Sequence, residues 1–439
     1  MKHHTSRGMR AVLTVAVASL AAVTLVTTTA GAQSSGNVPG VTDKSVKLGF
    51  IYSGTGVAAS TFKNSDRACK ARVDRTNREG GVNGRKVEIE VIDDKSSGAN
   101  LTAAKDLVEN RGVYGVINNS SFGFLSYRYL RDAGVPLVGG GFDGTYYGEK
   151  GNENILSALG NSAPFTGLAY DNITKLMKKA GAKKSAAVAY GASASSSASA
   201  KTLQDFAAPA SGLDPVYTNT SVEFGTSDVG PLVLGIKNAG ADAAYMPMVA
   251  ESNLALVQGL EQNGVEMKFN ALMTGYGQNL LDSPVAKTLK PNTYFLQTYK
   301  PVEVNDKATK QFQADRKKAG LTGVPDYGQY TGYITCDLAI TALEAMGKNV
   351  TREDFAPKFR ELGEYDAAGL NCRPYPVGLD SFGKFADTGC IYGVQVKNGK
   401  FVVVNKGKPV IGKLVGSEKA LEANATGNPS LVTTTTAAP

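Results

Sequence analysis

The sequence predicts an α/β protein with two doubly wound parallel-sheet lobes. Two observations support this prediction. From residue 44 onward, short apolar runs alternate with segments of helical periodicity, which is typical of βαβ units. The alternation then restarts near residue 164, so one series of units is followed by a second series. A chain of 439 residues is long enough to build a hydrophobic core in each lobe.

The first series of units begins with SVKLGFIY, an apolar run that stops at small and polar residues. The later apolar runs are also bounded by glycine or aspartate, and helix-period segments separate them. The expected strands are 45–52, 86–94, 112–119 and 135–140, and the expected helices are 61–81, 99–111 and 121–134.

The second series repeats the pattern but opens with a helix. Serines precede the helix expected at 195–211, where a side-chain oxygen can cap the free amides of the first turn. The expected helices are 164–181, 195–211, 228–240 and 252–264, and the expected strands are 185–190, 215–224, 242–248 and 268–274.

The part of the chain from residue 305 to the end does not have the pattern of a third lobe. Helices are expected at 305–320, 332–348 and 351–363. Thr351 is the expected cap of the third of these helices, with Glu353 and Asp354 in its first turn, where the helix dipole favours acids.

A hairpin is expected within residues 389–405, because Asn398-Gly399 is a strong signal for a tight turn between two strands. The late helices and this hairpin have no sheet of their own, so they must pack onto the two lobes. Residues 416–439 end in LVTTTTAAP and are expected to form a low-complexity, disordered tail.

The N-terminus has the three regions of a secretory signal. A basic start is followed by the uncharged apolar run 11–26 and by small residues that end at Ala32. We expect residues 1–32 to be removed and the mature protein to be periplasmic or extracellular. The alternative is a membrane anchor, but the run is short for a span of roughly 20 residues. No cysteine lies at the cleavage site, so no lipid anchor is expected.

Composition narrows the function. Both histidines, His3 and His4, lie in the signal, so the mature protein lacks histidine catalysis and histidine metal ligands. Removing the signal's three basic residues lowers the net charge from +8 to +5, and the remaining Lys and Arg are scattered. No nucleic-acid partner is therefore expected. Paired-carboxylate or Ser-Lys chemistry stays formally open.

The four cysteines form an even set in a chain that is expected to be exported, which indicates two disulfides with three possible pairings. We expect Cys372–Cys390, which flanks a Gly/Pro-rich stretch. We also expect Cys69–Cys336, which requires the first helix and a late helix to be neighbours.

Two glycine motifs suggest dinucleotide binding, and neither has the required context. Gly54, Gly56 and Ala59 fit G-x-G-x-x-A, but Asp93, at the end of the next strand, lies 37 residues after Gly56 rather than about 20. The second motif, GGGFDG at 139–144, is not followed by a helix that could hold a phosphate. No cofactor is expected.

The loops after the strands are the expected ligand site, because ligands of open α/β sheets bind beyond the carboxyl ends of the strands. In the first lobe these loops are small and polar, and Ser120-Ser121 is expected to open a helix whose amides suit a carboxylate. A plain helix cap is the alternative for Ser120. The candidate ligand contacts are Ser53, Ser120, Ser121, Gly141, Asp143, Tyr190, Glu251, Tyr276 and Tyr327.

Several motifs resemble those of type I periplasmic binding proteins, above all the Leu/Ile/Val-binding family of ABC transporters. They are NREGGVNGRK (77–86), the NSS loop, DAGVPLVGGG (132–141) and ADAAYMP (241–247). The resemblance spans residues 44 to about 404 and implies two lobes joined by three crossovers. Lobe one would be 44–158 plus 299–364, and lobe two would be 159–298 plus 365–410.

The resemblance also implies roles for single residues. The family's carboxylate-binding serine and loop fall on Ser120 and Gly141, whereas a threonine that contacts the ligand ammonium becomes Asp143. The family's aromatic lid falls near Ala194-Ser195, with Tyr190 as a displaced substitute. Its ammonium-clamping glutamate is replaced by Tyr276 or by Gly275.

The carboxylate half of the site is thus kept and the ammonium half is changed. Two alternatives remain open: Asp143 or Glu251 supplies the missing negative charge, or the ligand is an acid or amide without an amine. We expect an exported, non-enzymatic and monomeric solute-binding protein that captures a small organic ligand for the membrane permease of an ABC importer. The alternatives are a ligand sensor of the same fold and a secreted enzyme.

Overall fold

The structure is a computed structural model that describes residues 38–161, 167–226, 228–378, 381 and 384–427. The expected signal peptide, with its cleavage after Ala32, lies outside the described residues. Among the described residues, no helix is both long and apolar enough to cross a bilayer.

The first sheet has five parallel strands in the order β2-β1-β3-β4-β5. Strand β1 pairs along its full length with β2, and β3 is buried at every residue. The four strands expected in this lobe are confirmed, whereas β5 is three residues long and gave no sequence signal. The strands are β1 Ser45–Tyr52, β2 Lys86–Asp93, β3 Gly115–Asn119, β4 Leu137–Gly139 and β5 Ile155–Ser157.

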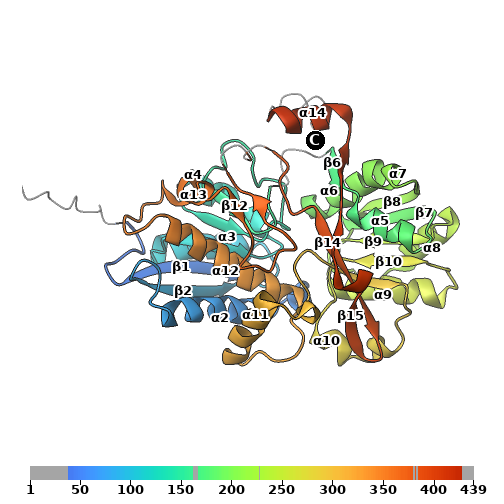
Figure 1. Ribbon diagram of the computed structural model, residues 1–439, viewed down its shortest axis with the longest axis horizontal. Coiled ribbons are helices and arrows are strands. Elements are labelled where there is room, and N and C mark those ends of the chain that lie inside the picture. Colours follow the sequence, from blue (N-terminus) through green and yellow to red (C-terminus); the bar gives the residue numbers. More distant parts are fainter. Residues whose placement is uncertain (1–37, 162–166, 227, 379–380, 382–383, 428–439) are drawn as a thin grey trace, which may run out of the picture. The chain divides into compact units, whose positions relative to one another are not determined.

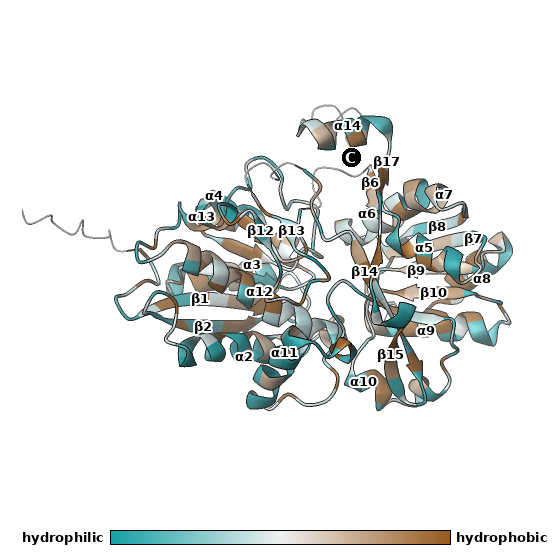
Figure 2. Cartoon of the chain, in the orientation of Figure 1, coloured by the Kyte–Doolittle hydropathy of each residue, from teal (hydrophilic) through white to brown (hydrophobic). Residues whose placement is uncertain are grey.

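Helices cover this first sheet (Figure 1). The single helix expected at 61–81 is instead two helices, because Asn64 adopts a left-handed conformation with φ of 64° and breaks the run. In Figure 2 the solvent-facing parts of α2 and α11 are hydrophilic, whereas the strands are hydrophobic. The helices are α1 Ala59–Phe62, α2 Ser65–Arg78, α3 Ala99–Lys105, α4 Tyr127–Asp132, α11 Lys307–Lys318, α12 Tyr327–Ala345 and α13 Phe355–Arg360.

Helix α13 starts later than the sequence predicts. Asp354 donates its backbone amide to the hydroxyl of Thr351 at 3.2 Å, and that hydroxyl bonds the Asp354 carboxylate at 3.0 Å. This side-chain turn satisfies the backbone amide of Asp354 before the helix begins. Glu353 and Asp354 therefore precede the helix rather than occupy its first turn.

The second sheet has the order β15-β14-β11-β10-β9-β7-β8, with β16 paired beside β14. The central strands are parallel, and β14 and β15 are antiparallel additions at one edge. The strands are β7 Lys184–Tyr190, β8 Asp214–Val222, β9 Ala243–Met246, β10 Phe269–Leu272, β11 Thr293–Gln297, β14 Cys390–Lys397, β15 Lys400–Val403 and β16 Val410–Ile411.

The predicted hairpin is confirmed by β14 and β15. Its two turn residues, Asn398 and Gly399, have positive φ values of 51° and 71°, as the favoured hairpin turn requires. Helices flank this sheet as well (Figure 1). They are α5 Asn172–Lys179, α6 Ala194–Thr202, α7 Ala208–Ala210, α8 Gly230–Ala239, α9 Ala250–Gln262 and α10 Gln278–Leu281.

Two expectations near the chain end are wrong, and one pairing explains both. Strand β6 (Leu168–Tyr170) takes up part of the expected helix 164–181, of which α5 confirms the second half, and it pairs with β17 (Leu414–Gly416), which leads into the expected disordered tail 416–439. Helix α14 (Glu418–Thr426) follows β17, is capped by Ser417 and packs its alanines against Leu168. Contacts so distant in sequence have no local signature. Residues 428–439 lie outside the described residues.

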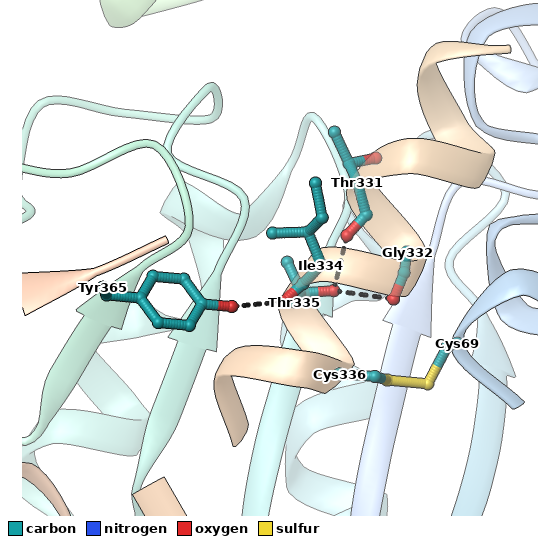
Figure 3. Close-up of a disulfide and its surroundings, with 7 residues drawn as sticks. All are labelled: Cys69, Thr331, Gly332, Ile334, Thr335, Cys336 and Tyr365. Atoms are coloured by element: carbon teal, nitrogen blue, oxygen red, sulfur yellow. Dashed lines mark hydrogen bonds between the residues drawn. A yellow bond between two sulfur atoms is a disulfide. The ribbon is translucent and has the colours of Figure 1, made fainter. Parts of the chain in front are cut away.

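Both predicted disulfides are confirmed. Cys69–Cys336 joins α2 to α12 in a close-packed interface, with 5.3 Å between the two Cα atoms (Figure 3). A glycine on α12 permits this approach: a Cβ at Gly332 would lie 2.2 Å from the carbonyl oxygen of Ser65, the first residue of α2. Cys372–Cys390 closes the loop that leads into β14, with a Cα separation of 6.5 Å.

A small antiparallel pair, β12 (Glu364–Tyr365) with β13 (Tyr375–Pro376), lies within the segment that leads from α13 to the second sheet. After β11 of the second sheet the chain returns to α11, α12 and α13 at the first sheet, and it then leads through this pair to β14 of the second sheet. It therefore passes between the two sheets more than once. The exact lobe boundaries given from the sequence remain a prediction.

Candidate functional site

A cavity of about 350 Å³ lies at the carboxyl ends of the strands of both sheets. Gly141 and Phe142 follow β4, and Ala158 follows β5. From the second sheet, Tyr190 ends β7 and Val249 follows β9. A cavity of this size between parallel-sheet edges suits a small organic molecule.

Aromatic rings form much of the cavity wall. Phe62, Phe142 and Tyr327 contact one another, with ring-centroid distances of 5.0, 5.6 and 5.9 Å. From the second sheet, the ring of Tyr190 lies 4.4 Å from that of Phe224. All five residues line the cavity. Such a wall offers a large apolar surface and favours ligands with an aromatic or aliphatic body.

The cavity carries little charge. Among the described residues that line it, none is Lys, Arg or His, and Asp387 is the single carboxylate. A ligand charge would therefore be met mainly by hydroxyl groups and amides rather than by an ion pair.

Ser121 and Gly141 both line the cavity, as the sequence predicts for ligand contacts. Within the described residues, the Ser121 hydroxyl makes no hydrogen bond, so it is available to a ligand. Gly141 has φ of +84°, and a Cβ there would lie 2.6 Å from the hydroxyl oxygen of Ser157. The loop therefore requires glycine at this point.

The helix expected to begin at Ser120-Ser121 does not begin there. A three-residue 3-10 turn, Gly123–Leu125, follows these serines, and α4 begins only at Tyr127. The Ser120 hydroxyl accepts the Phe122 amide at 2.9 Å, which closes a local turn in place of a helical cap. The predicted row of helix amides is thus absent behind Ser121.

Ser53 and Ser120 lie behind the cavity wall, fully buried beside Asp94. Ser120 donates its hydroxyl to Asp94, and Ser53 donates to the same carboxylate at 3.1 Å. Burial raises the pKa of Asp94, and the hydrogen bonds from these serines oppose that rise. Because its proton is already donated, Ser120 positions the turn that carries Ser121 and has no proton left for a ligand.

Asp143 also points away from the cavity. Its carboxylate accepts the hydroxyls of Tyr146 at 2.5 Å and Tyr147 at 2.6 Å, and the residue is 1 % exposed. Burial raises the pKa of Asp143 to about 6. The structure therefore favours the alternative in which Asp143 holds the loop and does not face a ligand ammonium.

The two remaining second-sheet candidates lie outside the cavity wall. Glu251 is exposed at the rim, where it accepts the hydroxyl of Ser60. Tyr276 is buried in the core, donates to Glu303 at 2.7 Å and packs 4.5 Å from Phe401. Neither residue supplies a negative charge inside the cavity.

The periplasmic binding protein family model matches residues 45–400. The chain belongs to this family. A relative called Leu/Ile/Val-binding protein homolog 7, from Brucella abortus, is 25% identical over 394 residues, which cover 87% of this chain and 96% of the relative. The family resemblance stated from the sequence motifs is thus confirmed.

Solved structures share the fold of this periplasmic binding protein. A fatty acid ABC transporter substrate-binding protein from Thermomonospora curvata has a TM-score of 0.69 at 20% identity, over 88% of this chain and 96% of that one. A solute-binding protein of an ABC transporter from R. palustris, in complex with benzoate, has a TM-score of 0.65 at 15% identity, over 84% and 98%.

Two tyrosines predicted as contacts do line the cavity of this periplasmic binding protein. The Tyr190 hydroxyl bonds Ser252 at 2.8 Å and the Val249 amide at 3.2 Å, so the ring alone faces the cavity. Tyr327 begins α12, and its hydroxyl makes no hydrogen bond within the described residues. Tyr327 therefore offers both an aromatic surface and a free polar group.

The sequence analysis missed several cavity residues of this periplasmic binding protein. The aromatic residues among them follow strands or end a helix, but nothing in their local pattern distinguishes a cavity ring from a core ring. Asn371 and Asp387 come from the disulfide-linked segment, whose path is set by contacts remote in sequence. The missed residues include Phe62, Phe142, Phe224, Asn371 and Asp387.

Proposed function

We propose that this protein captures a small carboxylate or amide with an aromatic or aliphatic body, and no α-amino group, for an ABC importer. The observation that carries the proposal is the aromatic cavity: its described lining does not include Asp143 or Glu251, the two acids predicted to meet a ligand ammonium, and Asp387 is its one carboxylate. Asp143 is bonded to two tyrosine hydroxyls and Glu251 lies at the rim. Of the two ligand classes left open by the sequence, this favours the class without an amine.

The polar contacts to the ligand would come from Ser121 and Tyr327, whose hydroxyls have no partners within the described residues. Each hydroxyl would donate a hydrogen bond to the ligand carboxylate, so the carboxylate would be held without an ion pair. A hydrogen bond to a charged acceptor is worth about 1.5–3 kcal/mol. The named ligands of the relatives include a fatty acid and benzoate, which support this ligand class.

The proposal includes four further parts that come from the sequence. The protein is exported after cleavage at Ala32, acts as a monomer and delivers its ligand to a membrane permease without chemical change. Its two lobes, residues 44–158 plus 299–364 and residues 159–298 plus 365–410, close on the ligand. The mass of the exported protein tests the cleavage site. Its size in solution tests the monomer, and a decrease in size with ligand tests the closure. Recovery of the unchanged ligand after binding tests delivery without chemical change.

A thermal-shift and calorimetry screen tests the ligand class. We expect benzoate, phenylacetate and octanoate to raise the melting temperature and to bind more tightly than leucine or isoleucine. Stabilisation by the amino acids alone would refute the proposal.

Two variants locate the ligand. Ser121→Ala should weaken binding of the best acid about tenfold, because one charged hydrogen bond is lost. Ser221→Ala is the matched control, since Ser221 is exposed on β8 and outside the cavity. Equal affinity of Ser121→Ala and the control would place the carboxylate elsewhere.

A further inference from the structure

The cavity has a second polar end, formed by the segment that the Cys372–Cys390 disulfide closes. Cys390 itself lines the cavity, as do Asn371, Asp387 and Thr388. Asn371 directly precedes one cysteine and Thr388 lies two residues before the other. The disulfide, with 6.5 Å between its Cα atoms, therefore brings both ends of the segment to the same part of the wall.

Asn371 carries an unsatisfied donor at this end. The residue is 4 % exposed, and its Nδ2 atom has no hydrogen-bond partner within the described residues. A buried amide group without a partner costs about 1–3 kcal/mol. An acceptor atom on a bound molecule would remove that cost, so Asn371 favours a ligand that carries one here.

Asp387, from the other end of the disulfide-linked part of the wall, supplies an acceptor. One of its carboxylate oxygens accepts the Gly389 amide, and the other makes no hydrogen bond within the described residues. Burial raises the pKa of Asp387 to about 6, and nearby Arg373 acts in the opposite direction. The free oxygen can therefore accept a hydrogen bond from a hydroxyl or amide donor on a ligand.

This end lies apart from Ser121. Ser121 follows β3, whereas the Asp387 segment is fixed beside the end of β5 by a hydrogen bond of 2.7 Å from the Asn161 amide to the Ala386 carbonyl. Strand β4 lies between β3 and β5 in the sheet. Two strand spacings correspond to about 10 Å, so one molecule with polar groups at both ends can reach both places.

We propose that Asn371 and Asp387 form a second ligand subsite, which binds a hydroxyl or primary carboxamide at the end of the ligand opposite its carboxylate. Either group can accept from Asn371 and donate to Asp387. The inference rests on the proposed function, which it narrows to acids that carry a second, neutral polar group across an apolar body.

The segment beyond the family match helps to hold this subsite. The Phe385 amide donates to the side chain of Asn424 in α14 at 2.7 Å. Helix α14 follows residue 400, where the family model ends. The C-terminal helix thus fixes the chain two residues before Asp387, so the position of the carboxylate depends on a helix outside the matched family region.

Matched ligand pairs test the subsite by calorimetry with the full mature protein. The pairs are benzoate with 4-hydroxybenzoate and 4-carbamoylbenzoate, and octanoate with 8-hydroxyoctanoate. We expect at least one substituted acid to bind tenfold more tightly than its parent. Equal affinities within every pair, with the parent acids bound, would overturn the subsite and leave the proposed function standing. Failure of every acid to bind would instead overturn the proposed function and, with it, the inference.

Variants assign the preference to the two residues. Asp387→Ala and Asn371→Ala should each reduce the tenfold preference, measured as the ratio of the affinities for the substituted acid and its parent, to threefold or less. Asp214→Ala, a change of an exposed acid on β8, is the matched control and should keep the preference. Two independent variants guard against a folding defect in one. If either variant is folded and keeps the tenfold preference for the substituted acid, the assignment of the subsite to that residue is overturned.

Discussion

The two disulfides hold two different kinds of region. Cys69–Cys336 lies where α2 packs on α12, among buried groups that bond one another: Arg72 pairs with Asp337 at 2.6 Å, and Tyr365 donates to the same carboxylate at 2.8 Å. Cys372–Cys390 instead closes a segment that lines the cavity and keeps unpaired polar groups.

The comparison separates stability from binding. Where polar groups are paired inside the protein, they organise the fold and have nothing to offer a ligand. Where they are left unpaired at a cavity wall, they cost stability and are available for binding. Changes in the first region should therefore alter unfolding without altering affinity, and changes in the second should alter affinity.

The largest expected effect is the loss of Cys69–Cys336. Replacing both cysteines with alanine frees a loop of 267 residues in the unfolded chain, and the chain-entropy relation gives a loss of roughly 5 kcal/mol in the free energy of unfolding. Chemical denaturation measures this loss. Below its melting temperature the variant should bind acids with wild-type affinity, and a changed ligand preference would break the comparison.

The loss of Cys372–Cys390 should be smaller in stability and larger in binding. The closed loop spans 18 residues, for which the same relation gives roughly 3 kcal/mol. Because the segment carries Asn371 and Asp387, the double alanine variant should also lose most of the preference for hydroxylated acids. Calorimetry with benzoate and 4-hydroxybenzoate checks this, and a retained preference would show that the segment holds its place without the bond.

Asp143→Asn should change the pH dependence of stability and not the affinity. Burial raises the pKa of Asp143 to about 6 from an ordinary value of 3.8. The folded protein therefore keeps a proton here that the unfolded chain has released, so the ionised carboxylate costs stability above about pH 6 and the cost disappears as the pH falls toward 4.

The asparagine cannot ionise and escapes this cost. Loss of the tyrosine hydrogen bonds should destabilise the variant by about 1–2 kcal/mol, and this deficit should be smaller at pH 7.5 than at pH 5. Denaturation of both proteins at the two pH values measures the difference, in which the other carboxyls cancel. A deficit independent of pH would argue against a buried, proton-binding Asp143.

The smallest expected effect is at the rim. Ser60, just before α1 ends, donates to Glu251 on α9, and this contact joins groups from the two sheets across the cavity mouth. Glu251→Gln keeps the size and weakens the bond, so ligand should dissociate about twofold faster, as expected for an exposed contact of about 0.5 kcal/mol. Glu266→Gln, at an exposed residue, is the control. A tenfold faster dissociation of the ligand would instead show that Glu251 contributes directly to binding.

The strands and the hairpin were predictable because their signals lie in short stretches of sequence. Both disulfides were predictable because four cysteines can pair in only a few ways. Long apolar runs mark β1 and β7, Asn398-Gly399 marks its own turn, and four cysteines allow few pairings. Strand β6 has three residues and exists only because β17 pairs with it from more than two hundred residues away. No local pattern contains that information.

The site was predictable at the level of loops but not of side chains. The loops after β3 and β4 do reach the cavity, yet Ser120 and Asp143 turn away from it. Their direction is decided by Asp94, which follows β2, and by the hydroxyls of two tyrosines further along the loop after β4. A sequence motif can predict in which loop a polar residue lies, but the hydrogen-bond partners of its side chain determine whether that side chain points into the cavity.

The order of the cysteines along the chain has a consequence for biogenesis. The native bonds join the first cysteine to the second and the third to the fourth. A polypeptide that emerges from a secretion channel with its N-terminus first presents Cys336 to the waiting thiol of Cys69 before Cys372 appears. An oxidase that pairs thiols in their order of emergence therefore forms the native pattern directly, without a disulfide isomerase.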